Sequence, residues 1–392
     1  MDKLKESKKM IGEIFLEIGE AIDSGKFGSQ SRVGITTLGS EHGIENVIKG
    51  AEKAQKENDD LKVVLIGPKV DTELQIAESN TEDEMYRKME DLLENGEIDA
   101  CVTMHYNFPI GVATVGKAIT PGLGKDIFLA TTTGTASTNR VEAMVKNTLY
   151  GIITAKTMGI ENPSVGILNL DGSRQVESAL KKLNSNGYQI NFGESARSDG
   201  GCVMRGNDLL SGSSDVMVAD TLTGNIMMKV FSSYTTGGNY ESAGYGYGPG
   251  IGENYNKIIL ILSRASGIPV VANAIRYAAK LAKGNLIEKS KDEFKKAKAA
   301  GLENILYELT KGSIKSEKQI LMPNKEVVTA QISGIDIMDL ESAVQMLWQE
   351  DVYAESGMGC TGPIVLVSEK NLTRAIEILE KNNHMAREAE DC

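Results

Sequence analysis

The chain has 392 residues, of which 41% are hydrophobic and 24% are charged, and its formal net charge is −12. This composition is typical of a globular protein with a sizeable core, and the lack of clustered Lys and Arg argues against a nucleic-acid partner, because binding phosphodiesters requires clustered cations. Four widely spaced cysteines without a CxxC pair, together with three histidines, predict neither a disulfide framework nor a metal site.

The N-terminal segment has a basic start but no uninterrupted apolar run. It therefore predicts an amphipathic helix and not a signal peptide. The sequence also lacks an apolar stretch of about 18 residues, the length that a membrane span requires. We therefore expect a soluble, cytoplasmic chain without membrane association.

From residue 33 onward, short apolar runs alternate with helical patterns. The expected strands cover residues 33–38, 62–67, 100–104, 128–132, 164–170, 215–220 and 257–262. The expected helices cover residues 44–56, 85–94, 141–158, 175–186, 226–231 and 271–283. This alternation predicts an α/β fold with a doubly wound, mostly parallel sheet and helices on both faces.

We expect an N-terminal α/β lobe over residues 1–150, a second α/β lobe over residues 151–285, and a small C-terminal α/β module over residues 286–392. The last boundary follows from a shift to a highly charged, helical composition after residue 285. Residues 235–254 are too glycine-rich for a core element and read as a long loop. That loop is either a lid or a flexible connector.

The loops that follow the expected strands have one chemical character: hydroxyl groups, glycines and helix N-termini, which together favour a bound anion. The relevant side chains are Ser173 and Arg174 in one loop, Thr223, Gly224, Asn225 and Lys229 in the second, and Ser263 and Arg264 in the third. Each Ser, Thr or Asp in these loops is individually explained as a helix N-cap. Taken together, the loops predict a phosphate site. Since no dinucleotide fingerprint is present, we expect no cofactor.

Cys360 lies in the sequence ESGMGCTGP, with glycines on both sides. Such glycines can expose a thiol and free backbone N–H groups, and a thiol can carry an acyl group that phosphate then attacks. The alternative is a small residue packed in a tight turn. His105 follows a strand end and is a possible acid or base, or else a structural histidine.

The segment from about residue 141 to 231 resembles the phosphate acyltransferase family of phospholipid synthesis, and phosphotransacetylases are more distant relatives. The stretches that carry the resemblance are YGIITAKTMGIENPSVGILNL and RGNDLLSGSSDVMVADTLTGNIMMK. The resemblance covers roughly residues 32–283 and implies the two-lobed fold of that family. It also implies that the phosphate and acyl crevice falls on Thr133, Gly134, Thr223, Gly224, Asn225, Lys229, Ser263 and Arg264. Transacetylases carry an aspartate shortly before their Ser-Arg pair, whereas residues 258–262 here are all apolar.

The core together with the extension that holds GMGCTGP is similar to a subfamily, the alpha subunit of component C of glycine/sarcosine/betaine reductase. This similarity implies that Cys360 accepts an acetyl group and releases it to inorganic phosphate as acetyl phosphate. The implied partners are the component C beta subunit and the selenoprotein component A, in a hetero-oligomer. Two alternatives stay open: a phosphate acyltransferase that uses a carrier-protein thioester, and a non-catalytic structural subunit.

Overall fold

The computed structural model describes residues 12, 15, 18, 19, 30–197, 200–311, 322–333, 335, 340–359 and 362–382. The chain forms two compact units, residues 1–310 and residues 311–392, and each is described by itself. The expected N-terminal amphipathic helix falls mainly on residues outside the described ranges. Within those ranges, no helix combines the length and the apolar composition needed to cross a membrane.

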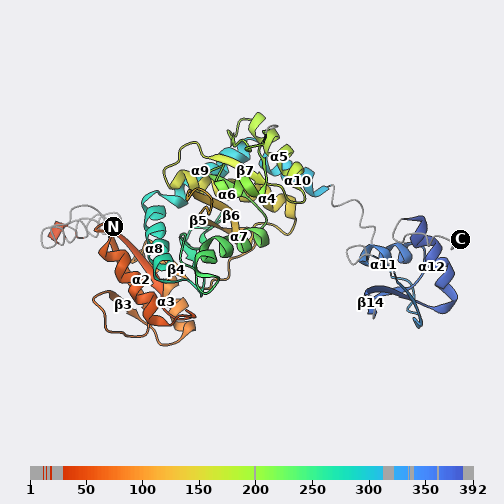
Figure 1. Ribbon diagram of the computed structural model, residues 1–392, viewed down its shortest axis with the longest axis horizontal. Helices are drawn as coiled ribbons and strands as arrows, with labels where there is room; N and C mark the ends of the chain where they lie inside the picture. The colour runs from red at the N-terminus through yellow and green to blue at the C-terminus, as the bar shows by residue number, and fades with distance from the viewer. Residues whose placement is uncertain are drawn as a thin grey trace, which may run out of the picture. The chain divides into compact units, whose positions relative to one another are not determined.

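The first unit is built on one large sheet flanked by helices (Figure 1). Its strands are β1 (Ser31–Thr36), β2 (Leu61–Gly67), β3 (Gln75–Glu78), β4 (Ala100–Thr103), β5 (Val112–Ile119), β6 (Asp126–Thr135), β7 (Ser164–Leu168), β8 (Asn191–Phe192), β9 (Val203–Met204), β10 (Val216–Val218), β11 (Gly248–Ile251) and β12 (Ile259–Ile261). Its helices are α2 (Ile44–Lys56), α3 (Glu82–Glu94), α4 (Arg140–Thr157), α5 (Ser173–Ser185), α6 (Gly206–Ser211), α7 (Thr221–Ser233), η1 (Tyr234–Thr236), α8 (Ile268–Lys283), α9 (Leu286–Ala299) and α10 (Leu302–Lys311).

The strands are hydrogen-bonded in the order β3-β2-β1-β4-β12-β11-β5-β6-β10-β7-β8, and β9 pairs with β7. Most neighbours are parallel, so the expected α/β fold with a mostly parallel sheet is confirmed. The antiparallel pairings of the described sheet all involve β11 or β5, in the middle of the order. As a result, the parallel group β1–β4–β12 runs opposite to the parallel group β6–β10–β7.

Alternating apolar residues divide each strand between two faces of the sheet, because successive side chains of a strand point to opposite sides. In β10, Val216 and Val218 join a core shared with α2, α4, α5, α8, α9 and α10, while Met217 joins a separate core with Met228 and Phe231 of α7. A third cluster packs α3 against the β1–β4 half of the sheet. Helices therefore cover both faces, as a doubly wound sheet requires.

The interpretation of residues 235–254 as a long loop is wrong, because this segment contributes the buried strand β11. Gly248 pairs with Ile261 of β12, and Gly250 pairs with Thr114 of β5, so the segment joins the two halves of the sheet. The glycines are needed for close packing. A Cβ atom on Gly248 would lie 1.7 Å from the Val115 carbonyl oxygen, and one on Gly250 would lie 2.4 Å from the Phe108 ring.

The charged helices α9 and α10 belong to the first unit, whereas the sequence placed them in the C-terminal module. The division into lobes over residues 1–150 and 151–285 stays a prediction. Glu293 of α9 is buried and joins α9 to α4: its carboxylate accepts hydrogen bonds from Lys156 Nζ at 2.8 Å and from the Tyr188 hydroxyl at 2.9 Å. Lys296 Nζ adds a third at 2.8 Å. Burial raises the pKa of Glu293, but these partners outweigh it and hold the pKa below the ordinary value of 4.5.

We expect Glu293→Gln to lower the free energy of unfolding by about 2 kcal/mol, because the charge-assisted hydrogen bonds to Lys156 and Lys296 are lost. The depressed pKa adds a pH signature. The carboxylate stabilises the fold fully above pH 4.5, and this contribution is lost as the pH falls through the lower folded pKa. Urea unfolding at neutral and acid pH tests both points. Equal stability of variant and wild type at neutral pH would contradict the assigned role.

The second unit pairs a three-stranded antiparallel sheet with two helices. Its elements are β13 (Ala330–Ile332), α11 (Leu340–Gln349), β14 (Ala354–Gly359), β15 (Gly362–Val367), η2 (Glu369–Asn371) and α12 (Leu372–Lys381). β14 pairs with β15 in a register that ends at Gly359 and Gly362. Between them in sequence stand Cys360 and Thr361, which lie outside the described residues.

Candidate functional site

A pocket of about 390 Å³ brings together three of the predicted site residues, His105, Thr133 and Gly134. We call it the central pocket. Its lining residues are Met104, His105, Tyr106, Asn107, Phe108, Thr133, Gly134 and Ile261. It is lined by the segment after β4, by β6 and by the last residue of β12. His105 is exposed, and its carbonyl oxygen accepts a hydrogen bond from the Thr103 hydroxyl at 3.2 Å.

Thr133, which lines the central pocket at β6, belongs to a network of threonine hydroxyls. Thr114 Oγ1 lies 2.7 Å from Thr132 Oγ1 and 2.9 Å from Thr133 Oγ1, and it accepts a hydrogen bond from the Thr133 backbone N–H at 2.9 Å. Gly134 next to it has a φ of +79°, and an added Cβ would lie 2.5 Å from the Val112 carbonyl oxygen. Glycine is therefore required there, and the position of the hydroxyls is fixed by the backbone.

The helix α7 packs its first turn directly on β6. A Cβ on Gly224 would lie 1.8 Å from the Thr131 carbonyl oxygen, so only glycine permits this approach. Asn225 Nδ2 donates to the Thr132 carbonyl oxygen at 2.9 Å, and the Thr221 and Thr131 hydroxyls are 3.1 Å apart. Gly224 and Asn225 thus hold the helix against the strand that lines the central pocket.

The N-terminus of α7 is capped by Asp220, whose carboxylate accepts hydrogen bonds from the Thr223 N–H at 2.9 Å and the Thr223 hydroxyl at 3.0 Å. Arg140 Nη2 donates to the same carboxylate at 2.8 Å, and Arg140 Nη1 lies 4.0 Å from Asp171. Burial raises the pKa of Asp220, but the bonds from Thr223 and Arg140 outweigh it and lower the pKa. The sequence did not single out Arg140, which connects the loops after β7 and β10.

Ser263 and Arg264 follow β12, in a loop that several elements hold in place. Ala265 N donates to Ser263 Oγ at 3.2 Å, and Glu41 N donates to the Arg264 carbonyl oxygen at 2.9 Å. Arg264 is exposed and Ser263 is half-buried. Ser263 stands two residues after Ile261 of the central pocket, so it lies within about 7 Å of that residue.

Ser173 and Arg174 lie at the start of α5, the helix that follows β7, and they do not line the central pocket. Ser173 is buried and its hydroxyl donates to Asn169 Oδ1 at 3.4 Å. Arg174 is exposed, and its Nη1 donates to Glu177 Oε2 at 2.9 Å on the same helix. The structure therefore places this pair apart from His105, Thr133 and Gly134.

Two of the four cysteines are buried. Cys101 lies in β4 and packs in a core, and burial raises its pKa well above the ordinary range. Cys202 is also buried, and burial together with the Glu177 charge raises its pKa to about 11. Because the thiolate is the reactive form, neither is suited to accept an acyl group. Cys360 and Cys392 lie outside the described residues.

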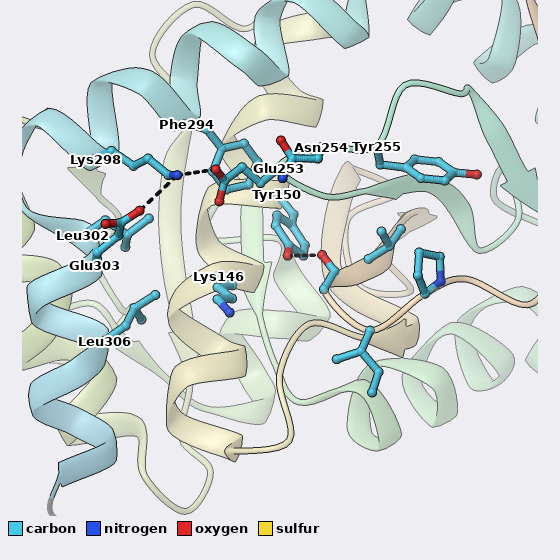
Figure 2. A pocket seen from close by; sticks show the side chains of 14 residues that line it. Lys146, Tyr150, Glu253, Asn254, Tyr255, Phe294, Lys298, Leu302, Glu303 and Leu306 are labelled. Atoms are coloured by element: carbon cyan, nitrogen blue, oxygen red, sulfur yellow. Dashed lines mark hydrogen bonds and ion pairs between the residues drawn. The ribbon is translucent and has the colours of Figure 1, made fainter.

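A second pocket of about 390 Å³ opens between α4, α9, α10 and the segments around Ile110 and Asn254 (Figure 2). Its cation Lys298 is paired with Glu253 and with Glu303, and Lys146 is paired with Glu142 at 2.6 Å. The Tyr150 hydroxyl donates to the Gly111 carbonyl oxygen at 2.6 Å. Since its cations are neutralised by these carboxylates, this pocket is a poor match for an anion. No predicted site residue lines it.

Three residues near the site were missed in the sequence: Thr114, Arg140 and Glu241. Thr114 lies in β5, which was not predicted because Lys117 and Gly116 interrupt its apolar pattern. In the structure Lys117 is buried, pairs with Asp126 at 2.7 Å and lies 3.8 Å from the centre of the Tyr245 ring.

Among the described residues, no group of three or more His, Cys, Asp or Glu is arranged to hold a metal ion.

Residues 31–366 match the model of a family described as fatty acid synthesis protein. The chain is 64% identical over 379 residues to the glycine/sarcosine/betaine reductase complex component C subunit alpha of Peptoclostridium acidaminophilum, across 96% of this chain and 98% of that protein. It is also 26% identical over 243 residues to a phosphate acyltransferase of Bacillus cereus (strain G9842), across 50% of this chain and 70% of that protein.

Among solved structures, a branched-chain phosphotransacylase from Enterococcus faecalis V583 matches 64% of this chain and 99% of its own chain. The TM-score of that match is 0.47 and the sequence identity is 16%.

Proposed function

The chain belongs to the family of the component C alpha subunit of the glycine/sarcosine/betaine reductase complex, within the wider fatty acid synthesis protein family, and from that premise we propose that it forms acetyl phosphate. In this proposal an acetyl group is held as a thioester on Cys360, and inorganic phosphate attacks its carbonyl carbon. The C–S bond breaks, a C–O bond to phosphate forms, and the proton of hydrogen phosphate ends on the sulfur. The relationship to phosphate acyltransferases supports an acyltransferase-type enzyme.

The single observation that most supports this proposal is the 64% identity over nearly the full length of both chains. Because it extends over 96% of this chain, the alignment reaches past the sheet unit into the unit that holds GMGCTGP. The cysteines add a second argument. Cys101 and Cys202 are buried with raised pKa values, and of the two remaining cysteines Cys360 is the one with glycines on both sides in the sequence.

We propose that phosphate binds at the loop Ser263–Arg264, together with Lys229, Thr133 and Gly134. Arg264 and Lys229 are exposed cations near this loop, and they can neutralise the attacking anion and orient it. Thr223, Gly224 and Asn225 hold α7 in place. Ser173 and Arg174 stay proposed contributors, although Arg174 is paired with Glu177. His105 stays a proposed acid or base at the central pocket.

The partners of this function are also proposals. The relative is named as a subunit of component C in a complex. We propose a beta subunit of the same component and the selenoprotein component A as partners, with acetyl phosphate as the product. A carrier-protein thioester is the second candidate acyl donor, favoured by the 26% identity to phosphate acyltransferases.

Arg264→Ala is expected to raise the KM for arsenate or phosphate by about 10- to 100-fold, because one charge-assisted hydrogen bond to the anion is lost. The assay is arsenate-dependent hydrolysis of acetyl phosphate by the full chain, in which acetyl arsenate forms and decomposes in water. Arg87→Ala is the matched control, since Arg87 is an exposed arginine on α3 outside the proposed site. An unchanged KM in Arg264→Ala would remove Arg264 from the phosphate site.

A further inference from the structure

Three threonine hydroxyls at the central pocket form a continuous relay of hydrogen bonds that ends on a backbone carbonyl. Thr132 Oγ1 donates to the Tyr247 carbonyl oxygen at 2.7 Å. Thr114 Oγ1 lies 2.7 Å from Thr132 Oγ1 and 2.9 Å from Thr133 Oγ1. Thr114 and Thr132 are completely buried, whereas Thr133 is half-buried and lines the pocket. The relay therefore connects the interior of the sheet to one side chain that a ligand can reach.

The carbonyl at the end of the relay fixes which oxygen donates in each contact. Two oxygen atoms approach this closely only with a proton between them, and a carbonyl has no proton to offer. The proton of Thr132 therefore lies toward Tyr247. Since a hydroxyl has a single proton, the contact between Thr132 and Thr114 uses the proton of Thr114. By the same reasoning, the contact between Thr114 and Thr133 uses the proton of Thr133.

This direction uses the full hydrogen-bonding capacity of Thr114. A hydroxyl has one proton to donate and two lone pairs to accept with. Thr114 donates to Thr132, and its lone pairs accept the Thr133 hydroxyl and the Thr133 backbone N–H, each at 2.9 Å. Thr133 has no proton left for the pocket, but its hydroxyl oxygen keeps both lone pairs. The central pocket thus presents a hydrogen-bond acceptor at a position fixed by the pairing of β5 with β6.

We propose that Thr133 accepts a hydrogen bond from the hydroxyl group of hydrogen phosphate, and that the relay thereby makes the site specific for an oxyanion that carries a proton. The inference rests on the proposed binding of phosphate at Thr133 and Gly134. An anion without a proton would place a lone pair against a lone pair of Thr133, and a polar group left unpaired disfavours binding. Thr114 and Thr132 are positioning residues, which act through Thr133.

The test compares hydrogen phosphate with monofluorophosphate, in which a fluorine atom replaces the hydroxyl group. In mildly alkaline buffer both ions are dianions of similar shape, but only hydrogen phosphate can donate a hydrogen bond. Isothermal titration of the full chain should show that phosphate binds roughly 10- to 100-fold more tightly than monofluorophosphate. Sulfate, a second dianion without a proton, should bind as weakly as monofluorophosphate.

Two substitutions of nearly equal shape test the relay and leave Thr133 in place. Thr114→Val removes the acceptor of the Thr133 proton, and Thr132→Val lets Thr114 donate to Thr133 instead. Either change frees the Thr133 proton for a ligand, so the preference for phosphate should fall below about threefold. Thr114→Ser keeps the hydroxyl and should keep the wild-type ratio. The matched control is Thr154→Val, which removes a buried hydroxyl that donates to the Tyr150 carbonyl oxygen at 2.8 Å in α4 and should also keep the ratio.

Thermal unfolding of each variant separates lost selectivity from lost folding, because Thr114→Val also leaves the Thr133 backbone N–H without its partner. A wild type that binds both ions equally would overturn the inference, as would a ratio that Thr114→Val and Thr132→Val leave unchanged, although phosphate binding itself would stay supported. A chain that binds neither ion would reject the proposed phosphate site and the inference with it. Arsenate-dependent turnover without selectivity would keep the proposed function and reject the inference alone.

Discussion

Cys360→Ala should reduce arsenate-dependent hydrolysis of acetyl phosphate to below about 1% of the wild-type rate, since removing a covalent nucleophile removes the acetyl-enzyme itself. The wild-type chain, with its partner subunit added if needed, should consume acetyl phosphate continuously in arsenate. Each cycle transfers the acetyl group to the thiol, releases phosphate and then forms acetyl arsenate. Mass spectrometry of the wild type after acetyl phosphate treatment should show one acetyl group on the peptide that contains Cys360.

Cys392→Ala is the matched control, because Cys392 is the other cysteine outside the two buried ones, and it should leave the rate unchanged. Equal rates in the wild type and Cys360→Ala would leave an acyltransferase in which Cys360 has no role, such as one acting on a carrier-protein thioester. No turnover by the wild type, even with its partner, would favour a structural subunit.

Gly248→Ala should destabilise the first unit by about 3 kcal/mol or more, because two costs add at this position. Gly248 has a φ of +85°, and an added Cβ would lie 1.7 Å from the Val115 carbonyl oxygen and 2.5 Å from its carbonyl carbon. Those atoms belong to the backbone of the neighbouring strand β5, so no side-chain rotation can relieve the contact. The substitution therefore separates β11 from β5, where the two halves of the sheet meet.

Gly238→Ala is the matched control in the same glycine-rich segment. Its φ is +84°, but no atom lies within 4 Å of the added Cβ, so it measures the backbone strain alone, about 1 kcal/mol. Urea unfolding of both variants gives the comparison. Similar losses in the two would show that the collision with Val115 is relieved and that β11 is not a rigid part of the sheet.

Much of the fold can be predicted from local patterns in the sequence alone. The apolar runs at β2, β7 and β10 and the amphipathic helices α2 and α8 were located within a few residues, because burial on both faces of a parallel sheet requires continuous apolar strands. The N-cap role expected for an Asp in these loops is confirmed at Asp220, whose carboxylate accepts a hydrogen bond from Thr223 N. The glycines at Gly134 and Gly224 were expected at the site, and the structure supplies the contacts that require them.

The sequence by itself determined the α/β class, the order of the main strands and helices, the candidate thiol at Cys360 and the hydroxyl-rich loops. Only the tertiary structure decided which of those loops meet. A reversal of direction at β11 and β5 makes the two parallel groups of strands run in opposite directions, and it depends on strand pairings between residues far apart in the chain. Glu241 is buried beside Ser266, to which it is bridged. Glycine-rich segments carry no apolar periodicity, so β11 is recognisable only from the neighbouring backbone that its glycines allow to approach.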